Sequence, residues 1–103
     1  MVKVPEPRFD LGTEGVVATP GALELLEEHG VAPATLIRRH HHGDWGNVSE
    51  GDRELNERSL ETGDRLMSSY SLGEDGDAIW VITEAVGEDG RRSVTTILRP
   101  SDY

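Results

Sequence analysis

The densest group of side chains with chemical potential is the run HHHGDWG at residues 40–46. Metal ligands on one helix must share a face, as positions four apart do, whereas adjacent histidines diverge by about 100° each. His40 and Asp44 have the favourable spacing, yet Gly43 is expected to end the helix between them. We therefore expect His40 to pack inside while His41 and His42 face water. The sequence predicts no metal site.

Trp45 lies between two glycines, Gly43 and Gly46, which permit tight turns on either side of its large ring. Such a ring can fill a gap between helices and a sheet. Asp44 can cap the following turn or pair with an arginine. One interpretation of this segment is structural; the alternative is a binding site that includes His40, Asp44 and Trp45.

Arg53, Arg65 and Glu84 are the other candidate binding residues. Glu84 follows Trp80 and Ile82 on one face of a predicted strand, so it should project beside the core near the strand end. A carboxylate there needs a cation or several N–H groups, and Arg65 on the neighbouring strand is one candidate. The alternatives are a structural ion pair, and a general base or an anchor for a basic group of a ligand.

Recognisable catalytic and cofactor motifs are absent from the sequence. The chain contains no cysteine, which excludes disulfides, thiolate metal sites and thiol catalysis. The segment GEDG at residues 87–90 is short and acidic, which suits a hairpin and not a phosphate cradle. The sequence predicts no catalytic residue and no cofactor.

Three short helices are predicted over residues 20–29, 33–42 and 50–62. Each begins at a capping residue or a proline and ends at a glycine: Thr19 and Gly30, Pro33 and Gly43, Ser49 and Gly63. The third helix carries only Leu55 and Leu60 as apolar side chains, so we expect it to lie half exposed.

A three-strand antiparallel meander is predicted over residues 65–72, 78–86 and 93–99, with turn-rich segments between the strands. The middle strand carries the continuous apolar run IWVI at residues 79–82, which is typical of a strand covered on both faces. Residues 9–11 and 16–18 can add short strands at an edge. Because helices and strands are segregated along the chain, we predict an α+β fold with the helices on one face of the sheet. Residues 1–8 are expected to form an extended lead-in and residues 9–103 one domain.

The charge balance limits the classes of partner. Twenty acidic and ten basic residues give a net charge of −10, which opposes nonspecific binding to nucleic acid. The excess serves solubility or a salty cytoplasm, or it forms a surface for basic sites that includes mimicry of nucleic acid. No membrane span and no signal peptide are visible in the sequence, so we expect a cytoplasmic protein that does not bind membranes.

Four segments together resemble a known family. They are HGDWG at residues 42–46, GDRL with the following SY at residues 63–70, IWVITE at residues 79–84, and TTILRPSDY at residues 95–103. In this combination they resemble a family of small bacterial proteins of about this length that are associated with plasmids or integrated elements. The resemblance covers residues 9–103. It implies an accessory role in a mobile element, and it carries over no activity and no site residue. The hairpin at residues 86–93 is longer than in that family, and Arg92 is the closest match to the arginine of the shorter turn.

We expect a protein-binding accessory module of mobile-element origin that contacts an unidentified protein partner through residues 43–46 and the third helix. One alternative is a small hydrolase or nuclease that uses Glu84 or His40, with arginines holding an anion. Another is a nucleic-acid-mimicking inhibitor of a defence or DNA-handling protein. A homodimer is a further alternative, because an outer strand of the meander can pair with a second copy.

Overall fold

The computed structural model describes residues 6–103 and confirms the α+β class. The element order is β1 (Val16–Ala18), α1 (Pro20–Glu28), α2 (Pro33–His41), α3 (Glu50–Thr62), β2 (Leu66–Ser71), β3 (Ala78–Thr83), β4 (Thr95–Leu98) and the 3-10 helix η1 (Pro100–Asp102). The predicted helices match to within a residue at each end. No helix in the described range is both long and apolar enough to cross a membrane.

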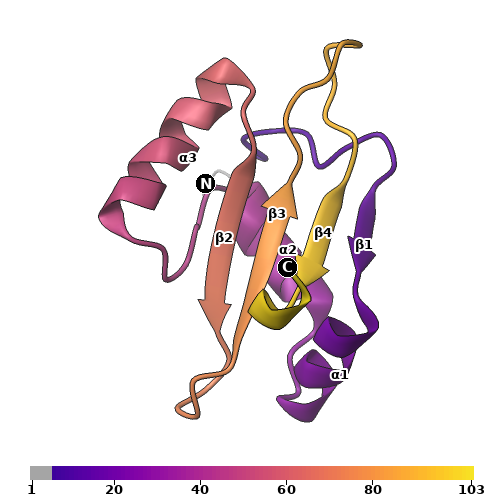
Figure 1. The fold of residues 1–103 in the computed structure, drawn as a ribbon, viewed down its shortest axis with the longest axis vertical. Helices are drawn as coiled ribbons and strands as arrows, with labels where there is room; N and C mark the ends of the chain where they lie inside the picture. Colours follow the sequence, from indigo (N-terminus) through magenta and orange to yellow (C-terminus); the bar gives the residue numbers. More distant parts are fainter. Residues whose placement is uncertain (1–5) are drawn as a thin grey trace, which may run out of the picture.

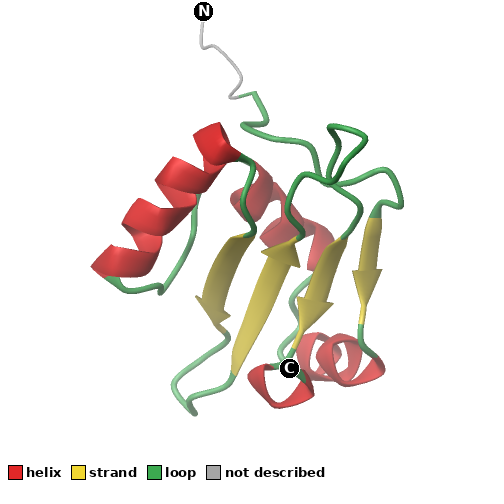
Figure 2. Ribbon diagram, turned by 45° about the horizontal axis from the view of Figure 1, so that its top comes forward, coloured by secondary structure: helices red, strands yellow, loops and turns green. Residues whose placement is uncertain are grey.

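The sheet has four strands in the order β1-β4-β3-β2 (Figures 1 and 2). The predicted antiparallel meander forms its β2, β3 and β4 part. One of the two short N-terminal strands is also present, because β1 pairs with β4, in parallel. Residues 9–11 form no strand. The sheet is therefore mixed and one strand wider than the meander.

All three strands of the predicted meander are shorter than expected, the last two by more than one residue at one end. The middle strand, predicted to reach residue 86, ends at Thr83, and the last strand begins at Thr95 instead of residue 93. The hairpin continues beyond these ends through single contacts, since the Glu84 amide donates to the Val94 carbonyl at 3.1 Å and Val86 forms an isolated bridge with Arg92. Beyond these ends the hairpin thus keeps its strand pairing only in part.

The core lies between the sheet and the first two helices. Ala22 and Leu26 of α1 and Leu36 of α2 pack against Ile79 and Val81 of β3. Figure 1 shows α2 crossing behind the strands. Burying these apolar side chains stabilises the two-layer arrangement.

The third helix does not lie on that face, which corrects the prediction of three helices on one side. Figure 1 shows α3 beside β2, at the outer edge of the sheet. The reason is the character of its inner surface. The two side chains that α3 buries are polar, Asn56 and Ser59, while its Leu55 points to solvent. A helix with a polar inner surface suits a strand edge, where backbone groups need hydrogen bonds.

The other face of the sheet is only partly covered. Along β3, Ile79 and Val81 face the helices, while Trp80 and Ile82 face the opposite side. Ile82 is buried and Trp80 half-buried. The C-terminal Tyr103 covers Trp80, with the two ring centroids 5.8 Å apart. The continuous apolar run thus reflects burial on both faces that is complete on one and partial on the other.

Candidate functional site

The turn at residues 43–46 is held by Asp44 in two ways that the sequence suggested. Its carboxylate accepts from Arg39 at 2.7 Å and from the Gly46 amide at 3.2 Å. Its carbonyl accepts from the Tyr70 hydroxyl at 2.6 Å. The Arg39 guanidinium is the main reason that the pKa of Asp44 lies below its usual value. Asp44 thus joins the end of α2 to β2.

Trp45 is buried, with 1% of its surface exposed, and cannot touch a partner in this conformation. Its indole N–H donates to Glu57 of α3 at 2.8 Å, and Glu57 also accepts two bonds from Arg8, of 2.8 and 3.1 Å. The ring stacks on Phe9 and meets His40 edge-on. Of the candidate binding residues here, Trp45 therefore supports α3 from inside, whereas Arg53 of α3 is exposed.

His40 is fully buried at the centre of a chain of hydroxyl groups. Thr95 donates to the Leu11 carbonyl at 2.6 Å, so its hydroxyl must accept from Thr83 at 2.7 Å. Thr83 in turn accepts from His40 Nε2 at 2.8 Å. The chain of donors therefore places a proton on Nε2. In the neutral imidazole, Nδ1 then accepts from the Ser68 hydroxyl at 2.6 Å.

The environment of His40 opposes protonation. Burial, with smaller contributions from the charges of His41 and Arg92, lowers the pKa of His40 to about 3. A neutral ring that no substrate can reach does not serve as a catalytic base. The structure therefore gives no support to His40 as the reactive group of a hydrolase or nuclease.

His41 and His42 were predicted to face water, but they are only partly exposed. Both are half-buried, because the segment before β1 folds over them. His41 Nε2 donates to the Phe9 carbonyl at 2.8 Å, and the Arg8 amide donates to the His41 carbonyl at 2.9 Å. Arg8, part of the predicted lead-in, is thus tied to the folded chain; residues 1–5 of that lead-in lie outside the described residues.

Arg65 and Glu84 are not brought together by an ion pair in the described part of the chain. Arg65 donates instead to the Tyr103 hydroxyl at 2.7 Å, and its guanidinium lies 5.6 Å from the centre of that ring. The buried cation near Glu84 is Arg92, which donates to the carbonyls of Glu84, Asp64 and Ser59. Arg92 therefore secures the end of α3 to the β3–β4 hairpin.

The outer edge of β2 is closed by side-chain and loop contacts. The Asn56 carboxamide of α3 donates to the Met67 carbonyl at 2.7 Å and accepts from its amide at 3.1 Å. Two residues further along, the Ser69 amide donates to Trp45 and its carbonyl accepts from Asn47. On the other side of the meander β4 pairs with β1, so within the described residues both outer strands of the meander have hydrogen-bond partners along their outer edges.

A cleft of about 180 Å³ lies between α3 and β2. Its lining residues are Asp52, Leu55, Asn56, Arg65 and Met67. Leu55 is 53% exposed. Arg53, on the neighbouring part of α3, is also exposed and lies 3.8 Å from Glu50. Of the six candidate binding residues, Arg65 lines this cleft, while Arg53 is exposed on another side of α3, because residues two apart on a helix do not face each other.

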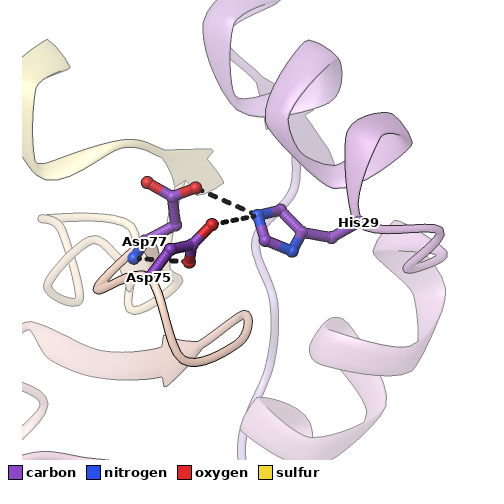
Figure 3. A group of neighbouring side chains, drawn as sticks. All are labelled: His29, Asp75 and Asp77. Atoms are coloured by element: carbon purple, nitrogen blue, oxygen red, sulfur yellow. Dashed lines mark hydrogen bonds and ion pairs between the residues drawn. The ribbon is translucent and has the colours of Figure 1, made fainter.

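A further cluster was not predicted from the sequence. His29 follows α1, and Asp75 and Asp77 lie in the loop between β2 and β3 (Figure 3). The His29 Nε2 atom lies 3.0 Å from an Asp77 oxygen and 3.7 Å from an Asp75 oxygen. The hydrogen bond to Asp77 is the main cause of a raised pKa of His29. The pattern DGD at residues 75–77 is typical of a turn between strands, and no local spacing connects it to His29.

Comparison with protein-family models, with curated proteins and with solved structures gives no match. The resemblance to plasmid-related proteins therefore stays a prediction from the sequence.

Proposed function

We propose that this chain is a small protein-binding module that contacts a partner with a basic surface through α3 and the cleft beside it. The observation that carries the proposal is the position of Leu55. It is an apolar side chain in the lining of the α3–β2 cleft, it is 53% exposed, and Asp52 of the same helix lies in that lining with it. The proposal includes the predicted accessory role in a mobile element, which is the setting in which the protein would meet its partner.

The charge of α3 favours a basic partner. The helix contains five acidic residues (Glu50, Asp52, Glu54, Glu57 and Glu61) and two arginines. Within the described residues, ion pairs involve only Glu50 and Glu57 of these acids. An excess of one charge around an apolar contact steers the encounter, while burial of the apolar group holds the complex.

The framework behind α3 suits a surface that binds without changing shape. Glu57 is held by Arg8 and by Trp45, and Asn56 is held by the backbone of Met67. A contact surface fixed in advance loses less conformational freedom when the partner binds. The buried Trp45 thus contributes to binding by positioning α3.

The test compares α3 with α1 as a matched control. We expect Leu55→Asp and Glu54→Lys each to lower the retention of a partner from a lysate of the source cell by at least about tenfold. The controls Leu23→Asp and Glu27→Lys change equivalent exposed positions of α1, where Leu23 is 47% exposed. They should leave retention unchanged. Equal losses from both helices, or none from α3, would contradict the assigned surface.

A salt titration of the identified complex tests the electrostatic part. We expect the affinity of the unmodified chain to fall steeply with ionic strength, and that of Glu54→Lys to fall less. The identity of the partner decides between a general interaction module and a mimic. A nucleic-acid-handling protein whose binding is competed by DNA would favour mimicry. Affinity that does not depend on salt would remove the requirement for a basic partner.

A further inference from the structure

We propose that His29, Asp75 and Asp77 form a binding site for a divalent first-row transition metal ion, with Zn²⁺ as the reference ion. The site lies where the end of α1 meets the β2–β3 loop, and it does not depend on the α3 surface (Figure 3). One imidazole nitrogen and two carboxylate oxygens are a ligand set that suits Zn²⁺ and its neighbours. The nitrogen ligand favours these ions over Mg²⁺ and Ca²⁺, which prefer oxygen.

The ligand atoms are already close enough to share an ion. One ligand atom from each residue lies within 4.8 Å of the other two. His29 Nε2 is 3.0 Å from Asp77 and 3.7 Å from Asp75. Tetrahedral Zn²⁺ with bonds of about 2.0–2.2 Å holds its ligand atoms about 3.3 Å apart. Small side-chain rotations bring the three atoms to those separations, without a change in the backbone.

The local charge also favours a cation. Two carboxylates converge on one ring nitrogen, and Glu28 adds a third negative charge nearby. His29 is the C-cap residue of α1, where the helix carbonyls concentrate negative potential. The imidazole balances this charge only when it is protonated. A divalent ion supplies two positive charges to the neutral ring, which is the form that binds metal.

Other contacts fix the backbone of the loop and the Asp75 side chain. Asp75 accepts from the Asp77 amide at 3.3 Å, and the Asp77 carbonyl accepts from Leu72 at 2.9 Å. The His29 ring lies against Gly73, where an added Cβ would stand 3.5 Å from its Cε1 atom. The carboxylates remain largely open, with exposed side-chain fractions of 59% for Asp75 and 41% for Asp77. Three protein ligands therefore leave coordination positions for water or for an external ligand.

The experiment is a Zn²⁺ titration of the chelator-treated protein at neutral pH, followed by calorimetry and by NMR of the histidine rings. We expect the largest changes at the His29 ring and at residues 72–78. Asp77→Asn and His29→Gln should each weaken binding by at least about tenfold, because each removes a ligand. Zn²⁺ should also raise the thermal midpoint of the unmodified chain, since it binds the folded state.

Asp89→Asn is the matched control. Asp89 accepts from the Arg91 amide at 3.0 Å in the β3–β4 hairpin, much as Asp75 accepts from Asp77. The Asp89→Asn variant removes a turn carboxylate that is not a metal ligand, so the affinity for Zn²⁺ should be unchanged. The proposal is overturned if the NMR changes centre on His41 and His42, if His29→Gln binds Zn²⁺ as tightly as the unmodified chain, or if no site-specific change occurs.

Discussion

Two histidines of this chain have opposite surroundings. His40 is fully buried, and both of its ring nitrogens contact neutral hydroxyls, those of Ser68 and Thr83. The His29 side chain is 19% exposed, and one of its nitrogens contacts two carboxylates. Burial lowers the pKa of His40, and the hydrogen bond to Asp77 raises the pKa of His29.

The difference shows which of these polar groups is available for binding. Around His40 every donor has a fixed acceptor, so the network stabilises one arrangement and leaves no capacity for a ligand. Around His29 the carboxylates are open and carry more negative charge than the ring can balance. The conspicuous motif at residues 40–46 therefore supports the fold, while an inconspicuous turn offers ligand atoms.

The largest expected effect comes from removing the ring next to His40. Trp45→Ala should lower the free energy of unfolding by about 3–5 kcal/mol, because it leaves a cavity and removes one of the donors to Glu57. His29→Ala should cost far less. Denaturant unfolding of both variants measures the contrast. Similar losses would mean that the His29 region carries as much of the stability as the core.

The second effect is a loss of folding stability in acid, caused by His40. Since His40 binds a proton in the unfolded chain near pH 6.5 but in the folded chain only near pH 3, stability should fall with decreasing pH below 6.5. The slope should approach about 1.4 kcal/mol per pH unit. Urea unfolding at pH values from about 7 to about 5 measures it. Ring NMR should show His40 neutral throughout that range. A His40 pKa near its ordinary value would contradict the assignment of a neutral buried ring.

The smallest expected effect comes from His29, whose contribution to stability changes with pH in the opposite direction. Because its folded pKa is raised, His29 contributes stability that is complete below pH 6.5 and is lost as the pH rises through the folded value. NMR titration of the His29 ring should show the raised pKa in the unmodified chain and a lower one in Asp77→Asn. Asp89→Asn should match the unmodified chain. An unchanged pKa in Asp77→Asn would show that the carboxylate is not the cause.

The helices could be predicted because their signals are local. Thr19 accepts from the Ala22 amide, Ser49 accepts from the Asp52 amide, and Gly63 ends α3 with a φ of +82°. The position of α3 could not be predicted in the same way. Its inward side chains, Asn56 and Ser59, are polar, and the order of helices and strands along the chain does not reveal that such a helix packs at a strand edge.

Contacts between residues far apart in the sequence also could not be predicted. The two roles suggested for Asp44 are local and both occur. The partner of Arg65 is Tyr103 and not Glu84, and the partners of His29 lie in a hairpin far along the chain. A pattern of spacing within one element carries no information on such pairs, because the arrangement of the elements decides them.

The parallel pairing of β1 with β4 also affects the order of folding. The register joins Val16 to Thr95, near opposite ends of the chain. The β2–β3 and β3–β4 hairpins can form from neighbouring residues, but β1 must wait for a loop that spans all three helices to close. We expect β1 to dock late and to slow folding, in line with the cost of non-local contacts. Until it docks, the outer backbone of β4 is open to any extended chain, so we expect the chain to be more prone to aggregate before β1 docks than after.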